Sequence, residues 1–285
     1  MGKSRKQKAN RPTRTPYNKP SKTHDHEVKI KSRAKTARSQ QQQNQIPTLP
    51  FDTRHRILLV GEGDFSFTHS LYTRHHCENL IATCFDSDTV LAEKYPQSTA
   101  YIQELEAAAR EDETVNIKIL YGVDATKLGK GGLGSGGKET RRGGFDRIIF
   151  NFPHVGGLTK DVNRQVRHNQ ELLVNFFRAA APLLAPEGSI IVTVFEGEPY
   201  SLWNIRDLAR HVDLKLGRSF KFQAEAYPGY KHARTLGNIE GGGGWKGEDR
   251  EARTYIFGRK DEEGEQGPPK IQKNKRSGSS DSDDD

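Results

Sequence analysis

Cysteine is nearly absent from this sequence, since Cys77 and Cys84 are the only two thiols among 285 residues. Two cysteines seven residues apart give neither a disulfide framework nor the paired spacing of a metal site, so we expect no bound metal. Long apolar runs are also absent, and none approaches the ~18 residues that a membrane-spanning helix needs. The first fifty residues lack the apolar core of a signal peptide. Together these absences predict a soluble, intracellular protein that does not contact membranes.

Hydrophobic residues are scarce as well, at 33% of the chain, with a mean hydropathy of −0.83. Such a low value predicts that part of the chain is disordered. The net charge is concentrated at the two ends of the chain. Residues 1–50 have a net charge of +11, residues 261–285 of −4, and residues 51–260 of only +1. We therefore expect one folded domain over 51–260, a disordered basic tail before it and a disordered acidic tail after it.

The basic tail contains KSRKQK and KIKSRAKTARSQQQQNQ, with prolines at 12, 16 and 20 and almost no aliphatic residues. Lysine and arginine at this density predict an arm that attracts nucleic acid, or a nuclear and nucleolar address. A tail that merely improves solubility is the alternative. The acidic, serine-rich end GSSDSDDD is expected to be solvated and is given no chemical role.

The folded part is organised around Arg56 to Phe67, which has the sequence RILLVGEGDFSF. Its apolar run Ile57–Val60 fits a strand that is covered on both faces, as in a parallel sheet. The following Gly61 and Gly63 allow a sharp turn and a close approach of a ligand to the main chain. A dinucleotide fingerprint would need a third glycine where this chain has Ser66, and a P-loop would need a Gly-Lys-Ser/Thr that is missing. A tight turn without any ligand is the alternative interpretation.

Acidic residues follow the next two predicted strands. Asp86 ends the apolar run 80–85 and lies 25 residues beyond Gly61, near the position at which a ribose is usually held. Asp88 is predicted to cap the next helix instead. Asp124 follows a strand over 115–120, where a solvated turn residue is the alternative.

The fourth predicted strand, 147–150, ends in the loop Asn151-Phe152-Pro153-His154. A proline restricts the residue before it to extended geometry, so we expect Phe152 to be extended and the carbonyl groups of this loop to have fixed directions. Because the carboxyl ends of parallel strands meet at one edge of the sheet, this loop should lie beside Gly61, Asp86 and Asp124.

A fifth strand is predicted over 189–195, helices over 170–180 and 202–212, and a closing antiparallel pair over 214–222 and 253–257. Residues 129–144 contain eight glycines and predict a flexible insertion. The alternation of strands and helices predicts a three-layer α/β/α sandwich with an antiparallel edge.

The order of these loops resembles S-adenosylmethionine-dependent methyltransferases more than NAD enzymes. In that class the first loop holds the methionine part of the cofactor, the acid after the second strand holds ribose, and the third loop holds adenine. The resemblance implies the following cofactor residues: Gly61, Glu62, Gly63, Asp64, Phe65, Ser66, Asp86 and Asp124.

Seven segments together resemble the fungal 25S ribosomal RNA uridine-N3-methyltransferase family. They are LLVGEGDFSF, ATCFDSD, GVDAT, FDRIIFNFPHVGG, HNQELL, FEGEPYSLWNI and YPGYKHARTLG. The resemblance covers residues 56–257 and implies a Rossmann-like domain, S-adenosylmethionine as cofactor, large-subunit rRNA within the pre-ribosome as substrate, and the nucleus and nucleolus as location.

Methylation at N3 of uracil requires the ring nitrogen to lose its proton and needs no covalent thiol step. We therefore expect Asn151 to anchor the base by hydrogen bonds, Phe152 to stack on it, Pro153 to shape the loop, and His154 to accept a proton. Tyr230, His232 and Arg234 are predicted to reach over the site, with Arg234 on phosphate, and packing of a loop lid is the alternative.

Two other functions remain open on the sequence. The chain could be a non-catalytic RNA-binding assembly factor that keeps the fold but not the cofactor, although intact Gly61, Gly63 and Asp86 argue against this. It could also methylate another base nitrogen in rRNA or tRNA. The Asn151 loop resembles the Asn/Asp-Pro-Pro-aromatic loop of enzymes that methylate nitrogen in bases, but Phe152 stands for its first proline and His154 for its aromatic residue, which argues against a simple exocyclic-amine mechanism.

Overall fold

A computed structural model describes residues 47–129, 133, 143–157, 159–235, 237–238 and 250–260. The predictions for both tails fall almost entirely outside these residues, and so does most of the predicted insertion 129–144. Leu133 within that insertion is described, and it is buried in the apolar core.

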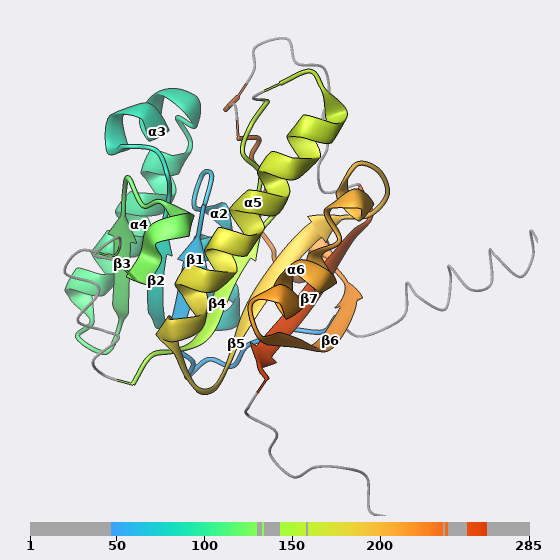
Figure 1. Ribbon diagram of the computed structural model, residues 1–285. Coiled ribbons are helices and arrows are strands. Elements are labelled where there is room, and N and C mark those ends of the chain that lie inside the picture. The colour runs from blue at the N-terminus through green and yellow to red at the C-terminus, as the bar shows by residue number, and fades with distance from the viewer. Residues whose placement is uncertain are drawn as a thin grey trace, which may run out of the picture. The chain divides into compact units, whose positions relative to one another are not determined.

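One seven-stranded sheet runs through the described residues, in the order β3-β2-β1-β4-β5-β7-β6 (Figure 1). Its strands are β1 (Ile57–Val60), β2 (Asn79–Thr83), β3 (Asn116–Leu120), β4 (Phe145–Asn151), β5 (Leu184–Phe195), β6 (Leu214–Lys221) and β7 (Ala252–Arg259). The first five strands are parallel, and β7 pairs antiparallel with both β5 and β6. The predicted α/β class and the closing antiparallel pair are confirmed.

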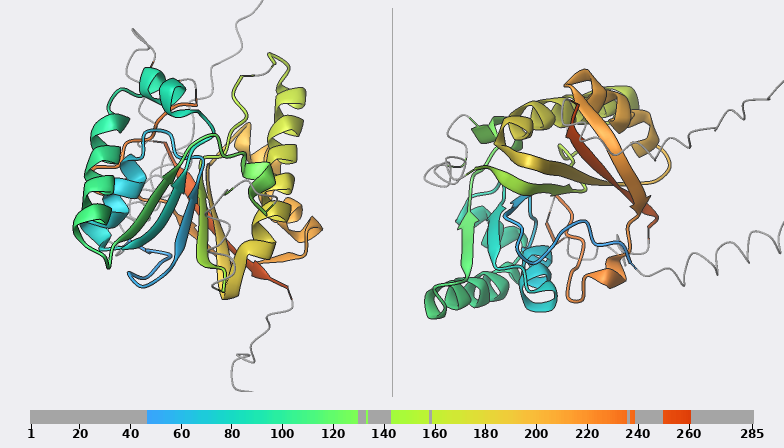
Figure 2. Two further views of the ribbon diagram at one scale, coloured as in Figure 1. Left: turned by 90° about the vertical axis from the view of Figure 1, so that its left-hand side faces the viewer. Right: turned by 90° about the horizontal axis from the view of Figure 1, so that it is seen from below.

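Helices cover both faces of this sheet (Figure 2). They are α2 (Ser66–His75), α3 (Asp88–Lys94), α4 (Ser98–Glu111), α5 (Val162–Ala180) and α6 (Ile205–His211), with short 3₁₀ turns η1 (Ala125–Lys127), η4 (Ala181–Leu183), η5 (Tyr200–Trp203) and η6 (Ala224–Ala226). Apolar residues of α5 and α6 join one core, and those of α2, α3 and α4 join the other. The three-layer arrangement follows from β1, all four residues of which are buried between these cores.

Side-chain caps fix where two of the helices begin. Ser87 accepts a hydrogen bond from Val90 N (3.3 Å) at the start of α3, and Asp161 accepts one from Arg164 N (3.0 Å) at the start of α5. The prediction that Asp88 caps α3 is wrong, because Asp88 is the first residue inside the helix and its carboxylate accepts from the adjacent Thr89 N. A cap at Ser87 leaves Asp86 directly before it, outside the helix.

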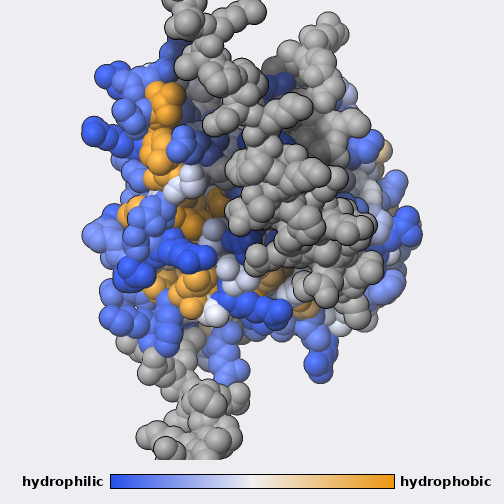
Figure 3. Space-filling view, turned by 90° about the vertical axis from the view of Figure 1, so that its right-hand side faces the viewer, coloured by the Kyte–Doolittle hydropathy of each residue, from blue (hydrophilic) through white to orange (hydrophobic). Residues whose placement is uncertain are grey.

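The edge strand β6 carries exposed cationic side chains at Lys215, Arg218 and Lys221. On the face toward this edge, apolar side chains form small patches among hydrophilic ones where the described residues are visible (Figure 3). Charged residues on an edge strand disfavour pairing with the strand of another molecule. The functional loops lie elsewhere, at the carboxyl ends of the parallel strands.

The sheet order reverses between β1 and β4, because β2 follows β1 on one side and β4 lies on the other. In open α/β sheets the crevice outside such a reversal is the usual ligand site. The loops after β1 and β4 meet there.

Candidate cofactor and acceptor site

A cavity of about 570 Å³ lies at this reversal point. Its lining comes from the loops after all four strands β1 to β4 and from residues 230–235 of the long connection before β7. The volume falls within the range of about 300–1,000 Å³ that is usual for small-molecule sites. The cavity is the larger of two that meet at the Asn151 loop.

Gly61 and Gly63, which follow β1, stand at positions where an added Cβ would collide with a neighbouring side chain. Gly61 has φ +67°, and a Cβ there would lie 2.5 Å from the Phe150 ring. A Cβ on Gly63 would lie 2.6 Å from Ala233 Cβ, across the cavity wall. Both glycines line the cavity, and a side chain at either position would collide with another residue of its lining.

The two acids of this loop have their carboxylates held by neighbouring groups. Glu62 accepts from Thr68 Oγ1 (2.9 Å) and Thr68 N (3.2 Å), and burial raises the pKa of Glu62 to about 7. Buried Asp64 accepts from Ser66 N (3.0 Å) and from Gln97 Nε2 (3.2 Å). Both residues line the cavity.

Phe65 and Ser66 do not line either cavity, so their predicted contact with a cofactor is not supported. Phe65 has φ 63° and is fully buried in the apolar core, where it precedes α2. Ser66 Oγ lies 3.2 Å from Lys231 O and accepts from Lys231 N (3.1 Å). These two residues hold the first loop against the core and against the segment that crosses above it.

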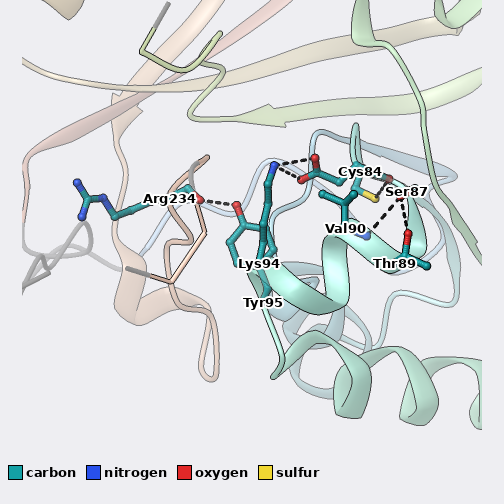
Figure 4. A network of polar contacts seen from close by, with 8 residues as sticks. Cys84, Ser87, Thr89, Val90, Lys94, Tyr95 and Arg234 are labelled. Carbon is teal, nitrogen blue, oxygen red and sulfur yellow. Dashed lines mark hydrogen bonds and ion pairs between the residues drawn. The ribbon is translucent and has the colours of Figure 1, made fainter. Parts of the chain in front are cut away.

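Asp86 lines the larger cavity, and Lys94 of α3 lies against it (Figure 4). Lys94 Nζ donates to both carboxylate oxygens of Asp86, at 2.7 and 2.9 Å. The next residue, Tyr95, donates from its hydroxyl to the main-chain oxygen of Arg234. Sequence patterns gave no signal for Lys94, because the partner of Asp86 lies eight residues away, at the far end of a helix.

Asp124 also lines the cavity and begins η1, accepting from Thr126 N (2.8 Å) and Thr126 Oγ1 (2.6 Å). Its carboxylate forms an ion pair with the exposed Lys127 (3.0 Å). Asp124 therefore has a structural task as a cap in addition to its place at the cavity.

Asn151 and Phe152 end β4 where the two cavities meet. Asn151 lines the larger cavity, and its buried Nδ2 has no hydrogen-bond partner among the residues that the structure describes. Phe152 lines both cavities and has φ 52°, so the predicted extended geometry before Pro153 is wrong. A hydrogen bond from Phe152 N to Thr193 O (2.8 Å) on β5 fixes this turn.

His154 accepts a hydrogen bond at Nδ1 from Gly156 N (2.9 Å). A ring nitrogen that accepts carries no proton, so the neutral ring holds its proton on Nε2 and presents a donor there. Burial lowers the pKa of His154, which favours this neutral form. The geometry gives no support to His154 as a proton acceptor and matches a histidine that orients the backbone of its own loop.

Residues 230–235 cross the loop edge of the sheet and line both cavities. Tyr230 lines the larger cavity, Arg234 the smaller one, and His232 both. His232 Nδ1 lies 3.1 Å from Tyr230 Oη, and its ring packs 4.3 Å from that of Phe152. Burial and the neighbouring Arg250 lower the pKa of His232 to about 4, so its ring is neutral at physiological pH.

A smaller cavity of about 220 Å³ adjoins the first across Phe152 and His232. Its remaining walls include Phe195, Tyr200, Trp203 and Arg250. Sequence reasoning missed Trp203 and Arg250 as site residues. Trp203 belonged to one of the family segments without an assigned role, and Arg250 follows a glycine run that carries no pattern.

Among the described residues, no three His, Cys, Asp or Glu side chains are grouped so that they could hold a metal ion. No described helix is long and apolar enough to cross a membrane.

The family model BMT5-like, described as rRNA (uridine-N3-)-methyltransferase, matches residues 58–234, which contain β1 from Leu58 on, the strands β2 to β6 and the Asn151 loop. The chain belongs to this family. The predicted family resemblance is thereby confirmed.

Two curated relatives differ in how much of their length this chain spans. The 25S rRNA (uridine(2634)-N(3))-methyltransferase of Saccharomyces cerevisiae is 33% identical over 268 residues, covering 76% of each chain. Heavy metal-associated isoprenylated plant protein 41 of Arabidopsis thaliana is 36% identical over 186 residues, covering 65% of this chain but only 34% of the plant protein. Among solved structures, a TehB-like SAM-dependent methyltransferase from Corynebacterium glutamicum matches with a TM-score of 0.38 and 12% identity, over 72% of this chain and 80% of that one.

Proposed function

We propose that this protein is an S-adenosylmethionine-dependent methyltransferase that methylates N3 of a uridine in large-subunit rRNA. The observation that carries the proposal is the large cavity at the sheet reversal, between the glycine loop and the Asn151 loop, in a chain of this family. Its relative in yeast is named as a 25S rRNA uridine-N3 methyltransferase.

The residues of the larger cavity fit S-adenosylmethionine. The cavity volume is large enough for this cofactor, and at Gly61 and Gly63 no side chain covers the main chain. The buried amide nitrogen of Asn151 lacks a partner among the described residues. Gly61 and Gly63 would face the methionine part, Asp86 together with Lys94 the ribose, and the Asp124 loop the adenine. When bound, this cofactor supplies an electrophilic methyl group to a nucleophilic atom.

The acceptor side of the site must orient a ring nitrogen and let its proton leave. Phe152 lines both cavities and packs against Phe195 and His232, and Asn151 offers an amide in the larger cavity. Positioning of this kind accounts for much of the rate when the nucleophile is held in line with the methyl carbon. Protein side chains that stack on a flipped base also favour its extrusion from the RNA.

Thiol chemistry has no place in this proposal. Cys77 and Cys84 are both buried, and neither lines either cavity. Burial raises the pKa of each thiol to about 12, so both remain protonated at neutral pH. This agrees with an N3 reaction, which proceeds without a covalent enzyme intermediate.

The substrate implies a location and a partner. A protein that methylates large-subunit rRNA would meet it in the pre-ribosome, in the nucleolus of the nucleus. The basic residues 1–50 would add RNA affinity that declines with salt. Imaging of the full chain fused to a fluorescent protein, with and without residues 1–50, tests this location.

The decisive test uses purified protein, tritiated S-adenosylmethionine and large-subunit rRNA from cells that lack the enzyme. We expect the wild type to label this RNA and Asn151→Ala to lose at least about tenfold in rate, because it removes a hydrogen bond worth ~1–3 kcal/mol at the reacting centre. The matched control is Asn163→Ala on the exposed start of α5. Undiminished labelling by Asn151→Ala would contradict the site.

A non-catalytic assembly factor is the second candidate, and one observation favours it. Both oxygens of Asp86 are already engaged by Lys94, at the position where a ribose would be held. Calorimetry with S-adenosylhomocysteine separates the two functions. Binding in the micromolar range supports the enzyme, whereas no heat at millimolar ligand supports the assembly factor.

A further inference from the structure

The smaller cavity beside Phe152 is aromatic and positively charged. Its rings come from Phe152, Phe195, Tyr200 and Trp203, and its cations from Arg234 and Arg250. Among the described residues that line it there is no aspartate or glutamate. Glu196, the acid that follows Phe195, is not part of the lining, and its carboxylate accepts from Arg253 Nε (2.6 Å).

Arg250 is held over the aromatic wall. Its guanidinium carbon lies 4.3 Å from the ring centre of Phe195 and 5.2 Å from that of Tyr200, and its Nη1 lies 3.4 Å from Tyr200 Oη. Stacking on two rings fixes a guanidinium group while leaving N–H donors at its edge. The Arg250 side chain therefore holds a positive charge at a fixed position in the cavity lining.

The other titratable groups that line this cavity are unsuited to remove a proton. His232 is neutral and its pKa is lowered to about 4, so it is a weak base. His154 uses Nδ1 to accept from Gly156 N, which leaves a donor at Nε2. The remaining polar groups are the phenol of Tyr200 and the guanidinium of Arg234, and a guanidinium has hydrogen-bond donors but no acceptor.

We propose that this cavity holds the acceptor uracil and that Arg250 stabilises the negative charge of the ring once N3 has lost its proton. This inference rests on the proposed function and adds to it a charged residue and a reason for the choice of base. The 220 Å³ cavity has the volume for a single pyrimidine beside its cluster of aromatic rings, next to the larger cavity.

The chemistry balances without a protein base. The N3–H bond breaks, its proton passes to hydroxide or a buffer base in solvent, and its electron pair stays on the ring, shared among N3, O2 and O4. The pair on N3 then forms the bond to the methyl carbon as the bond from that carbon to sulfur breaks. The ring is neutral again afterwards, and Arg250 has served as counter-ion to the anion in between.

The positive charge of the two arginines also disfavours the methylation of exocyclic amines. An exocyclic amine of adenine or cytosine gains positive charge as it is methylated, and a cavity whose described lining has two arginines and no acid disfavours that state. An imide such as N3 of uracil passes through an anion, which the cavity favours. The departure of this loop from that of amine methyltransferases thereby acquires a physical reason.

The test is the pH profile of single-turnover transfer to large-subunit rRNA from cells that lack the enzyme. We expect the rate to rise with pH and then level off as the bound ring becomes anionic. In Arg250→Gln the midpoint should move upward by about one pH unit, since a nearby opposite charge shifts a pKa by about 1–3 units. The rate at neutral pH should fall about tenfold, and the rates should converge at high pH.

Two further variants guard against a purely structural effect. Arg250→Lys keeps the charge and should recover part of the shift. Arg206→Gln removes a comparable exposed stack, on Tyr255 at 5.6 Å outside either cavity, and should leave the profile unchanged. Affinity for S-adenosylhomocysteine should be equal in all four proteins.

Two outcomes overturn the inference while leaving the proposed function intact. One is an unchanged profile in Arg250→Gln. The other is an equal loss of rate at every pH together with weaker, less salt-sensitive RNA binding, which identifies Arg250 as a phosphate contact. A wild-type protein that transfers no methyl group contradicts the proposed function itself and this inference with it.

Discussion

The two cavities that meet at Phe152 differ in the charges that line them. The larger one is lined by four acids, Glu62, Asp64, Asp86 and Asp124, and by two lysines, Lys94 and Lys231. The smaller one is lined by two arginines and by the rings of two phenylalanines, a tyrosine and a tryptophan, and the described part of its lining has no acid. Acids suit a ligand with a positive sulfonium, and arginines suit a base that becomes negative, so the difference matches a cationic donor and an anionic acceptor on either side of one loop.

The largest expected effect comes from closing the larger cavity. Gly63→Val places a side chain where even a Cβ lies 2.6 Å from Ala233 Cβ. Overpacking costs ~1–3 kcal/mol, so the affinity for S-adenosylhomocysteine should fall about tenfold to a hundredfold by calorimetry. Gly258→Val on β7, where a Cβ meets nothing within 4 Å, is the control and should bind normally. Full affinity in Gly63→Val would contradict the assignment of this cavity to the cofactor.

The Asp86 carboxylate tests which groups of the larger cavity hold the ligand. Asp86→Asn removes the charge that Lys94 and the expected ribose share, and should weaken S-adenosylhomocysteine binding about tenfold, because a hydrogen bond to a charged group contributes ~1.5–3 kcal/mol. Asp88→Asn, two residues on and exposed, should leave the affinity unchanged. Equal effects of the two changes would show that Asp86 acts on the fold of α3 and not on the ligand.

The neutral state of His232, which lines both cavities, can be tested without any ligand. The folded pKa of His232 is about 4, below the ordinary 6.5, because burial and Arg250 disfavour its charged form. The unfolded chain thus binds more protons in this window, and the protein should lose stability as pH falls from about 6.5 to about 4.

In His232→Asn this part of the loss disappears. The difference in free energy of unfolding between wild type and variant should change by about 2–3 kcal/mol over that window, measured by urea denaturation. Using the difference removes the contribution of Glu62, whose raised pKa acts in the opposite direction. His76→Asn at an exposed site is the control. A constant difference across the window would contradict a neutral His232.

The sequence predicted the frame of the larger cavity because that frame follows from strand order. An apolar run such as Ile57–Val60 is buried on both faces, and the carboxyl ends of parallel strands share one edge, so Gly61, Asp86, Asp124 and Asn151 had to meet. Local patterns of this kind can be recognised in the amino-acid sequence alone.

Hydrogen bonds and distant partners account for what the sequence did not predict. The role of His154 depends on which nitrogen accepts from Gly156 N, and the turn at Phe152 depends on a bond to Thr193 of another strand. Lys94 and Arg250 reach the two cavities only through the packing of α3 and the start of β7. No spacing in the chain encodes these contacts.

The central claim is tested most directly by the nucleosides of large-subunit rRNA. RNA from cells lacking this protein is incubated with the purified full chain and S-adenosylmethionine, digested to nucleosides and separated by mass spectrometry. The account predicts that 3-methyluridine is absent before incubation and appears after it. Formation of a methylated adenosine or cytidine instead, or of no methylated nucleoside, would contradict it.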